Sequence, residues 1–141
     1  VTPRSEFRRR MLGSVQGSFA DSMLVRSRLL FTRDDGLRAV WEERPATLGE
    51  RDRRVQLLRA GIGCLPTRVK AEKWLRVRRD PEYTTLYLLF TAEALARVEI
   101  FDAAQNPGRE VLQQALALNP GFFETVYTGL LRGPRDMAHL E

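Results

Sequence analysis

Glu93 and Arg97 are the residues of this chain whose types and spacing best suit chemistry. They stand four positions apart, so on a helix they share a face and can form an ion pair. In a functional interpretation Glu93 is a candidate general base, and Arg97 orients it or binds an anion. The alternative is a purely structural ion pair. Glu99 is a second candidate base, but six positions along a helix turn it about 240° away from Glu93, so the two carboxylates do not converge.

Cysteine and histidine counts exclude several classes of chemistry. Cys64 and His139 are the only residues of their types in the 141-residue chain. This excludes an internal disulfide and most zinc sites, and it argues against Ser-His-Asp and Cys-His catalysis. We therefore expect no metal and no cofactor in this chain alone. With no apolar leader and no membrane-length apolar stretch, we expect a cytoplasmic protein without a membrane partner.

Positive charge is concentrated in the middle of the chain. Residues 51–79 carry a net charge of +8, whereas residues 80–141 carry −5. The strip that could contact phosphates or a nucleic acid consists of Arg68, Lys70, Lys73 and Arg76. The alternative is a solvated helix face beside an acidic neighbour. Only Trp74 interleaves as a stacking side chain and no recognition motif is present, so nucleic-acid binding is the less favoured interpretation.

Three Asx-Pro pairs mark helix starts in the C-terminal half. The side chain of Asp or Asn can cap a first turn, and proline suits the first helical position. The pairs Asp80-Pro81, Asn106-Pro107 and Asn119-Pro120 predict helices over 81–104, 107–117 and 120–132. The first of these is apolar nearly all round, which is typical of the central helix of a bundle.

A long helix is predicted over 49–79. Thr47 and Glu50 have the spacing of a capping box. Gly61, Gly63 and Pro66 should bend this helix or divide it near Gly63. Apolar spacing predicts a core made of Val55, Leu58, Ile62, Leu65, Val69, Trp74, Leu86, Phe90, Leu95, Val98, Leu112, Leu116, Phe122, Val126 and Leu130.

These elements predict a mostly α protein. We expect an antiparallel helical bundle over residues 49–141, preceded by an irregular N-terminal segment, residues 1–48. That segment should hold at most one or two short strands, with residues 28–32 as one candidate. Leu37, Val40 and Trp41 indicate a short helix after the turn at residues 33–36.

Two stretches resemble a known family. The run LLFTRDDGLRAVWEE, residues 29–43, resembles the junction between the catalytic palm and the helical domain of polymerase-β-like nucleotidyltransferases. Residues 69–131 resemble the helical C-terminal domain of the antibiotic and minimal nucleotidyltransferases. The family's palm carries Gly-Ser followed by Asp-x-Asp, which binds Mg²⁺. This chain has Gly13-Ser14 and Gly17-Ser18, but Asp21 is followed by Ser22 and Met23, so the metal-binding motif is absent.

The resemblance implies a helical substrate-binding or scaffolding domain that is not catalytic alone. Residues 1–48 would then be a remnant of the palm. Mg²⁺ and nucleotide would bind only where a palm domain is supplied as a partner. Glu93 or Glu99 would act as the base for an acceptor hydroxyl, and the acceptor pocket would be lined by Tyr83, Tyr87 and Arg97. The alternative is a stand-alone module that binds a protein partner or self-associates.

Overall fold

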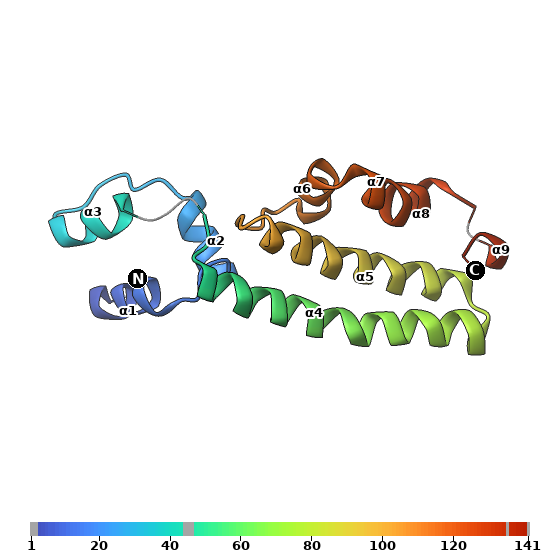
Figure 1. The fold of residues 1–141 in the computed structure, drawn as a ribbon. Helices are drawn as coiled ribbons and strands as arrows, with labels where there is room; N and C mark the ends of the chain where they lie inside the picture. The colour runs from blue at the N-terminus through green and yellow to red at the C-terminus, as the bar shows by residue number, and fades with distance from the viewer. Residues whose placement is uncertain (1–2, 44–46, 135, 141) are drawn as a thin grey trace.

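The computed structural model describes residues 3–43, 47–134 and 136–140. Within these ranges the chain is mostly α-helical and contains no strand (Figure 1), which confirms the predicted fold class. The helices are α1 (Arg4–Gly13), α2 (Phe19–Arg26), α3 (Asp35–Glu42), α4 (Glu50–Lys73), α5 (Pro81–Asp102), α6 (Val111–Leu118), α7 (Pro120–Phe123), α8 (Leu130–Arg132) and α9 (Met137–Leu140), with π-helical turns η1 (Trp74–Arg78) and η2 (Glu124–Gly129).

Helix α4 begins one residue later than predicted and without the predicted capping box. Gly49 is its N-cap and has no side chain with which to cap the first turn. Glu50 does not reach back to Thr47 but pairs with Arg54 at 2.7 Å. A distant residue takes over the capping role, because the Gly49 N–H donates to Gln16 Oε1 at 2.7 Å.

The glycines and the proline of α4 do not interrupt it. The helix runs for 24 residues through Gly61, Gly63 and Pro66 and passes directly into η1. Of the two predicted alternatives, a single helix is therefore the one observed. The chain then reverses at Arg79, whose φ is +54°, and Asp80 caps α5 by accepting from the Tyr83 N–H at 2.9 Å.

Helix α5 is the central element, as its apolar surface predicted. Figure 1 shows it between α4 on one side and α6 to α8 on the other. Toward α6 and α7 it contributes Ala96 and Ile100 to a buried cluster, completed by Val111, Ala115 and Phe123. Toward α4 its Phe101 packs with Leu48 and Ala60 in a second buried cluster. The chain thus forms layers, with α4 as an outer layer.

The two remaining Asx-Pro predictions had different outcomes. Asn119 does cap a helix, accepting from the Phe122 N–H at 3.3 Å, and the helical path continues through η2 to Arg132. The prediction at Asn106 is wrong, because α6 begins only at Val111. Gln114 instead binds this loop, accepting from the Gly108 N–H at 2.9 Å.

The N-terminal segment is more helical than predicted. Residues 28–32 form no strand, since no neighbouring strand among the described residues offers a ladder of hydrogen bonds. The predicted short helix is present as α3, and Asp34 caps it by accepting from the Leu37 N–H. Figure 1 places α1, α2 and α3 together beyond the start of α4, at the opposite end from the C-terminus.

The predicted core of α4 is wrong at every position except Val55. Leu58, Ile62, Leu65 and Val69, which we call the outer face of α4, are 56–65% exposed. The buried residues of α4 are instead Gln56, Ala60 and Ala71, which we call its inner face. By the 100° helical step the two faces are opposite. The physical reason is local size, because Phe101 of α5 fills the layer and Ala60 opposite it is short. Gln56 is buried where the loop before α2 meets α4, and its Nε2 donates to the Gln16 carbonyl.

Other predicted core residues also differ in burial. Leu86, Phe90 and Phe122 are 41–45% exposed. The rest are partly buried, and they are Val55, Trp74, Leu95, Val98, Leu112, Leu116, Val126 and Leu130. None of the described helices is long and apolar enough to cross a membrane.

Candidate functional site

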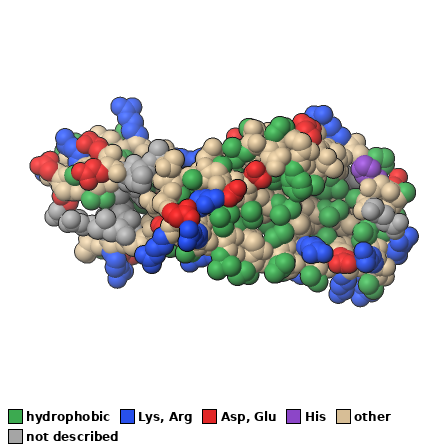
Figure 2. Space-filling model, in the orientation of Figure 1, with side chains coloured by type: hydrophobic (Ala, Val, Ile, Leu, Met, Phe, Trp, Pro, Cys, Tyr) green, Lys and Arg blue, Asp and Glu red, His purple; other side chains and the backbone are tan. Residues whose placement is uncertain are grey.

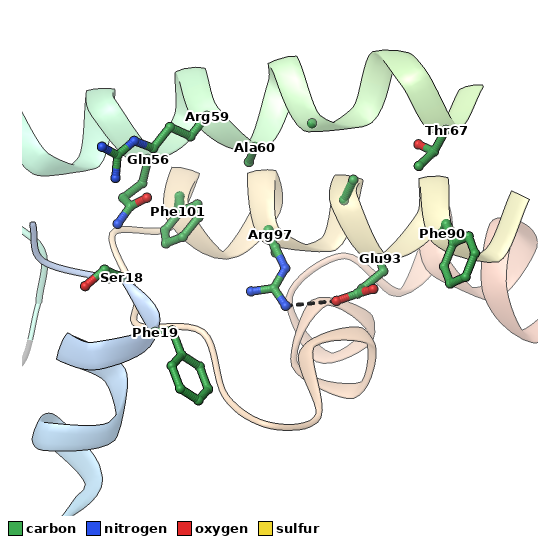
Figure 3. Close-up of a pocket in the computed structure, with 13 residues that line it drawn as sticks. Ser18, Phe19, Gln56, Arg59, Ala60, Thr67, Phe90, Glu93, Arg97 and Phe101 are labelled. Carbon is green, nitrogen blue, oxygen red and sulfur yellow. Dashed lines mark hydrogen bonds and ion pairs between the residues drawn. The ribbon is translucent and has the colours of Figure 1, made fainter. Parts of the chain in front are cut away.

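A groove runs between α4 and α5 where the start of α2 approaches them (Figure 3). The groove is open to solvent and has a volume of about 540 Å³. Its lining comes from three parts of the chain: Gly17, Ser18 and Phe19 at the start of α2, Gln56, Arg59, Ala60, Gly63 and Thr67 on α4, and Phe90, Glu93, Ala94, Arg97 and Phe101 on α5. Segments far apart in the sequence thus build one concave surface.

The groove carries the ion pair predicted from sequence. Arg97 Nη2 donates to Glu93 Oε1 at 2.8 Å, and both side chains remain 42–45% exposed. Figure 3 shows the two side chains extending together from α5. On α4, Arg59 lines the same groove and has no acidic partner among the described residues. The groove therefore offers one carboxylate and two guanidinium groups.

Aromatic rings give the groove its apolar surface. Phe101 is buried, whereas Phe90 is 45% exposed and Phe19 is 84% exposed. Figure 3 places Phe19 and Phe90 toward opposite ends of the groove. A ligand in this groove would therefore contact both charged and aromatic groups.

The loop before α2 is held in place by hydrogen bonds. The Gly17 N–H donates to the buried Asp21 Oδ2 at 2.8 Å. Gln56 of α4 donates through Nε2 to the Gln16 carbonyl at 2.8 Å, which joins the loop to α4. Gly17 adopts φ +75°, and a Cβ there would lie 2.7 Å from Leu48 Cδ2, so this position requires glycine.

Glu99 does not join this groove. Its Oε2 accepts from Asn119 Nδ2 at 3.4 Å, toward α6 and α7 rather than toward Arg97. The structure therefore brings Glu93 and Arg97 together and leaves Glu99 outside.

Tyr83 and Tyr87 are also outside the groove lining. Tyr83 stacks on Trp74 with 4.4 Å between ring centroids, where α4 turns into α5. Tyr87 lies under Lys70, whose Nζ is 5.2 Å from its ring centroid. Of the three predicted acceptor-pocket residues, only Arg97 lines the groove.

The basic residues of 68–76 lie on several sides of α4 and on η1, which holds Arg76. Arg68 and Lys73 are exposed, Lys70 covers Tyr87, and Arg76 pairs with Glu72 at 3.2 Å. At 100° per residue these positions point in different directions, so they do not form one phosphate-binding row.

A separate charge cluster holds the start of α4. Arg53 pairs with Asp102 at the end of α5, and Glu50 receives hydrogen bonds from Arg54 and Arg53. These two bonds, that of Arg54 first, hold the pKa of Glu50 below its ordinary value of 4.5.

Sequence reasoning missed the contributions of Phe19 and Gln56 to the groove. Both depend on the N-terminal loop meeting α4, a contact between residues 40 positions apart. No local spacing signals it; the one hint is a glutamine beside the otherwise small residues of the inner face of α4.

No protein-family model matches this chain, and comparisons with curated proteins and with solved structures find no match either.

Proposed function

We propose that this chain is a helical substrate-binding domain of a nucleotidyltransferase-like protein and is not catalytic alone. The observation that carries the proposal is the groove whose rim holds Glu93 and Arg97. The resemblance of residues 29–43 and 69–131 to that family supplies the context. In this proposal the metal-binding residues belong to a palm domain supplied as a partner.

The groove suits a small acceptor that carries a hydroxyl and an anionic group. The Glu93 carboxylate can accept a hydrogen bond from a hydroxyl, and in the complete protein it would serve as the base for that hydroxyl. Arg97 and Arg59 can bind a carboxylate or a phosphate. The exposed ring of Phe90 provides an apolar wall. Glu99, Tyr83 and Tyr87 have no part in this proposal.

Titration with glucose 6-phosphate, followed by calorimetry, tests substrate binding. This probe carries both hydroxyls and a phosphate, whereas glucose carries hydroxyls alone. We expect the phosphate to increase affinity and Arg97→Gln to remove that increase. The matched control is Arg132→Gln, which removes an exposed arginine of α8 that does not line the groove. Equal effects of the two variants would contradict a site at Arg97.

Incubation with Mg-ATP and the same sugar phosphate tests the absence of catalysis. We expect no adenylyl transfer by the purified chain. Transfer that Glu93→Gln abolishes would overturn the claim that the chain is not catalytic alone.

A second function, self-association, is favoured by a different observation. The outer face of α4 leaves four large apolar side chains more than half exposed.

A further inference from the structure

The outer face of α4 is an apolar row with positive flanks. Leu58, Ile62, Leu65 and Val69 follow one another at steps of four, three and four residues, which places them in one line along the helix. By the helical step, Arg68 flanks the row on one side and Lys73 flanks it on the other. Neither of these basic side chains has an acidic partner among the residues described.

The molecule exposes more surface than its size requires. Its accessible surface is 9656 Å², against about 7,500 Å² for a compact monomer of this mass. The excess is larger than the roughly 800 Å² per partner that a stable protein interface buries. Figure 2 shows hydrophobic side chains beside Lys and Arg side chains along the edge that α4 forms.

Helix α3 is a second apolar element that its own chain covers only in part, and its charge is opposite. Leu37, Val40 and Trp41 form its apolar stripe; all three are half-buried, and no residue of α3 is fully buried. Immediately before it, Leu30 and Phe31 are 86% and 75% exposed. Residues 34–43 carry a net charge of −3, whereas residues 51–79 carry +8.

We propose that the outer face of α4 binds helix α3 of a second copy of this chain. Apolar residues of α3 would cover Leu58, Ile62, Leu65 and Val69, and its acidic ends would approach the basic flanks. Two such contacts, related by a two-fold axis, would form a closed dimer. Direct packing of α4 against α4 of a second copy is disfavoured, because both surfaces are basic and like charges repel. This proposal does not depend on the groove or its ligand.

Sedimentation velocity over a concentration series tests the dimer. We expect the mass to rise from 16.2 kDa to twice that value, and association to weaken with added salt. Ile62→Asp on the outer face, or Trp41→Ala on α3, should raise the dissociation constant by at least about tenfold. Val77 is also exposed and apolar but lies near the end of η1. The control variant Val77→Asp should therefore leave the dissociation constant unchanged. Circular dichroism should be the same for all three variants, because each replaces a side chain that is not buried.

Mixing the two variants identifies the surfaces that meet. In the proposed dimer, a mixed pair retains one intact contact, between the α3 of Ile62→Asp and the α4 of Trp41→Ala. The mixed dimer should therefore be tighter than either variant alone. An interface of α4 with α4 would show no such rescue and would overturn the proposal.

Three other results would also overturn it. One is a monomer at every concentration. Another is a monomer in which the outer face of α4 is protected from solvent and the fluorescence of Trp41 does not change with protein concentration. This result would show that α3 folds back onto the α4 of its own chain. The third is a monomer that binds vesicles of anionic lipid through Ile62, which would assign the face to a membrane surface.

Discussion

The two faces of α4 differ in opposite ways in their apolar sequence pattern and in their burial. The outer face has large apolar residues at ideal spacing and is more than half exposed. The inner face has Gln56, Ala60 and Ala71, no marked apolar pattern, and is buried against α5. Apolar spacing thus identifies a face that is suited to a contact with another surface, but it does not predict that this surface belongs to the same chain. Four changes test this difference.

The largest effect is expected at Phe101, which α4 covers with its inner face. Phe101→Ala should lower the free energy of unfolding by about 3–5 kcal/mol, because it removes a buried ring and leaves a cavity. Urea unfolding measures this loss. Phe19→Ala is the matched control, since that ring is 84% exposed. A loss similar in both variants would mean that the buried cluster of Phe101, Leu48 and Ala60 is not a core.

A smaller loss of stability is expected at Gly17, where the loop before α2 meets the buried cluster of Phe101, Leu48 and Ala60. Gly17→Ala should cost about 1–3 kcal/mol. The new Cβ would meet Leu48 and Phe101, and φ at this position is +75°. Gly61→Ala, where a Cβ meets nothing within 4 Å, should instead be neutral or stabilising. Thermal unfolding of the two variants side by side gives the comparison, and a tolerated Gly17→Ala would contradict the close approach of this loop to α4.

The outer face should contribute almost nothing to the stability of the dilute monomer. Leu65→Ala should change the free energy of unfolding by less than about 0.5 kcal/mol. The same urea measurement, repeated at high protein concentration, should reveal a larger effect, because the proposed dimer would add stability there. A large loss under dilute conditions would place Leu65 in the core after all.

The smallest effect concerns the start of α4 and depends on pH. The pKa of Glu50 is lowered by hydrogen bonds from Arg54 and Arg53. Its contribution to stability is therefore present above the ordinary pKa of 4.5 and is lost as pH falls through the lower folded value. Glu50→Gln should reduce the stability difference between neutral and acidic pH slightly. Glu82→Gln, at an exposed position of α5, is the control, and melting temperatures across that range provide the measurement.

Local signals predicted much of the fold. Asp80 and Asn119 start helices because their capping groups belong to the same turn, and α5 is central because it is apolar nearly all round. The predicted helix start at Asn106 was wrong because Gln114, from the following helix, holds the turn after Asn106. The capping box at Thr47 failed because Gln16 caps α4 from 33 residues away.

The candidate site was predictable only within one helix. Glu93 and Arg97 pair because they are one helical turn apart. Tyr83 and Tyr87 lie elsewhere because Trp74 and Lys70, both from the preceding helical stretch, cover their rings. Such contacts depend on how helices are placed relative to one another, which spacing along one helix does not encode.

Hydroxyl-radical labelling of the outer face of α4, read by mass spectrometry at increasing protein concentration, tests the central claim most directly. We predict that Leu58, Ile62, Leu65 and Val69 are labelled in dilute protein and become protected on concentration, together with Trp41. Protection at every dilution would show that the face is covered within one molecule. Labelling at every concentration would show that a second copy does not cover it.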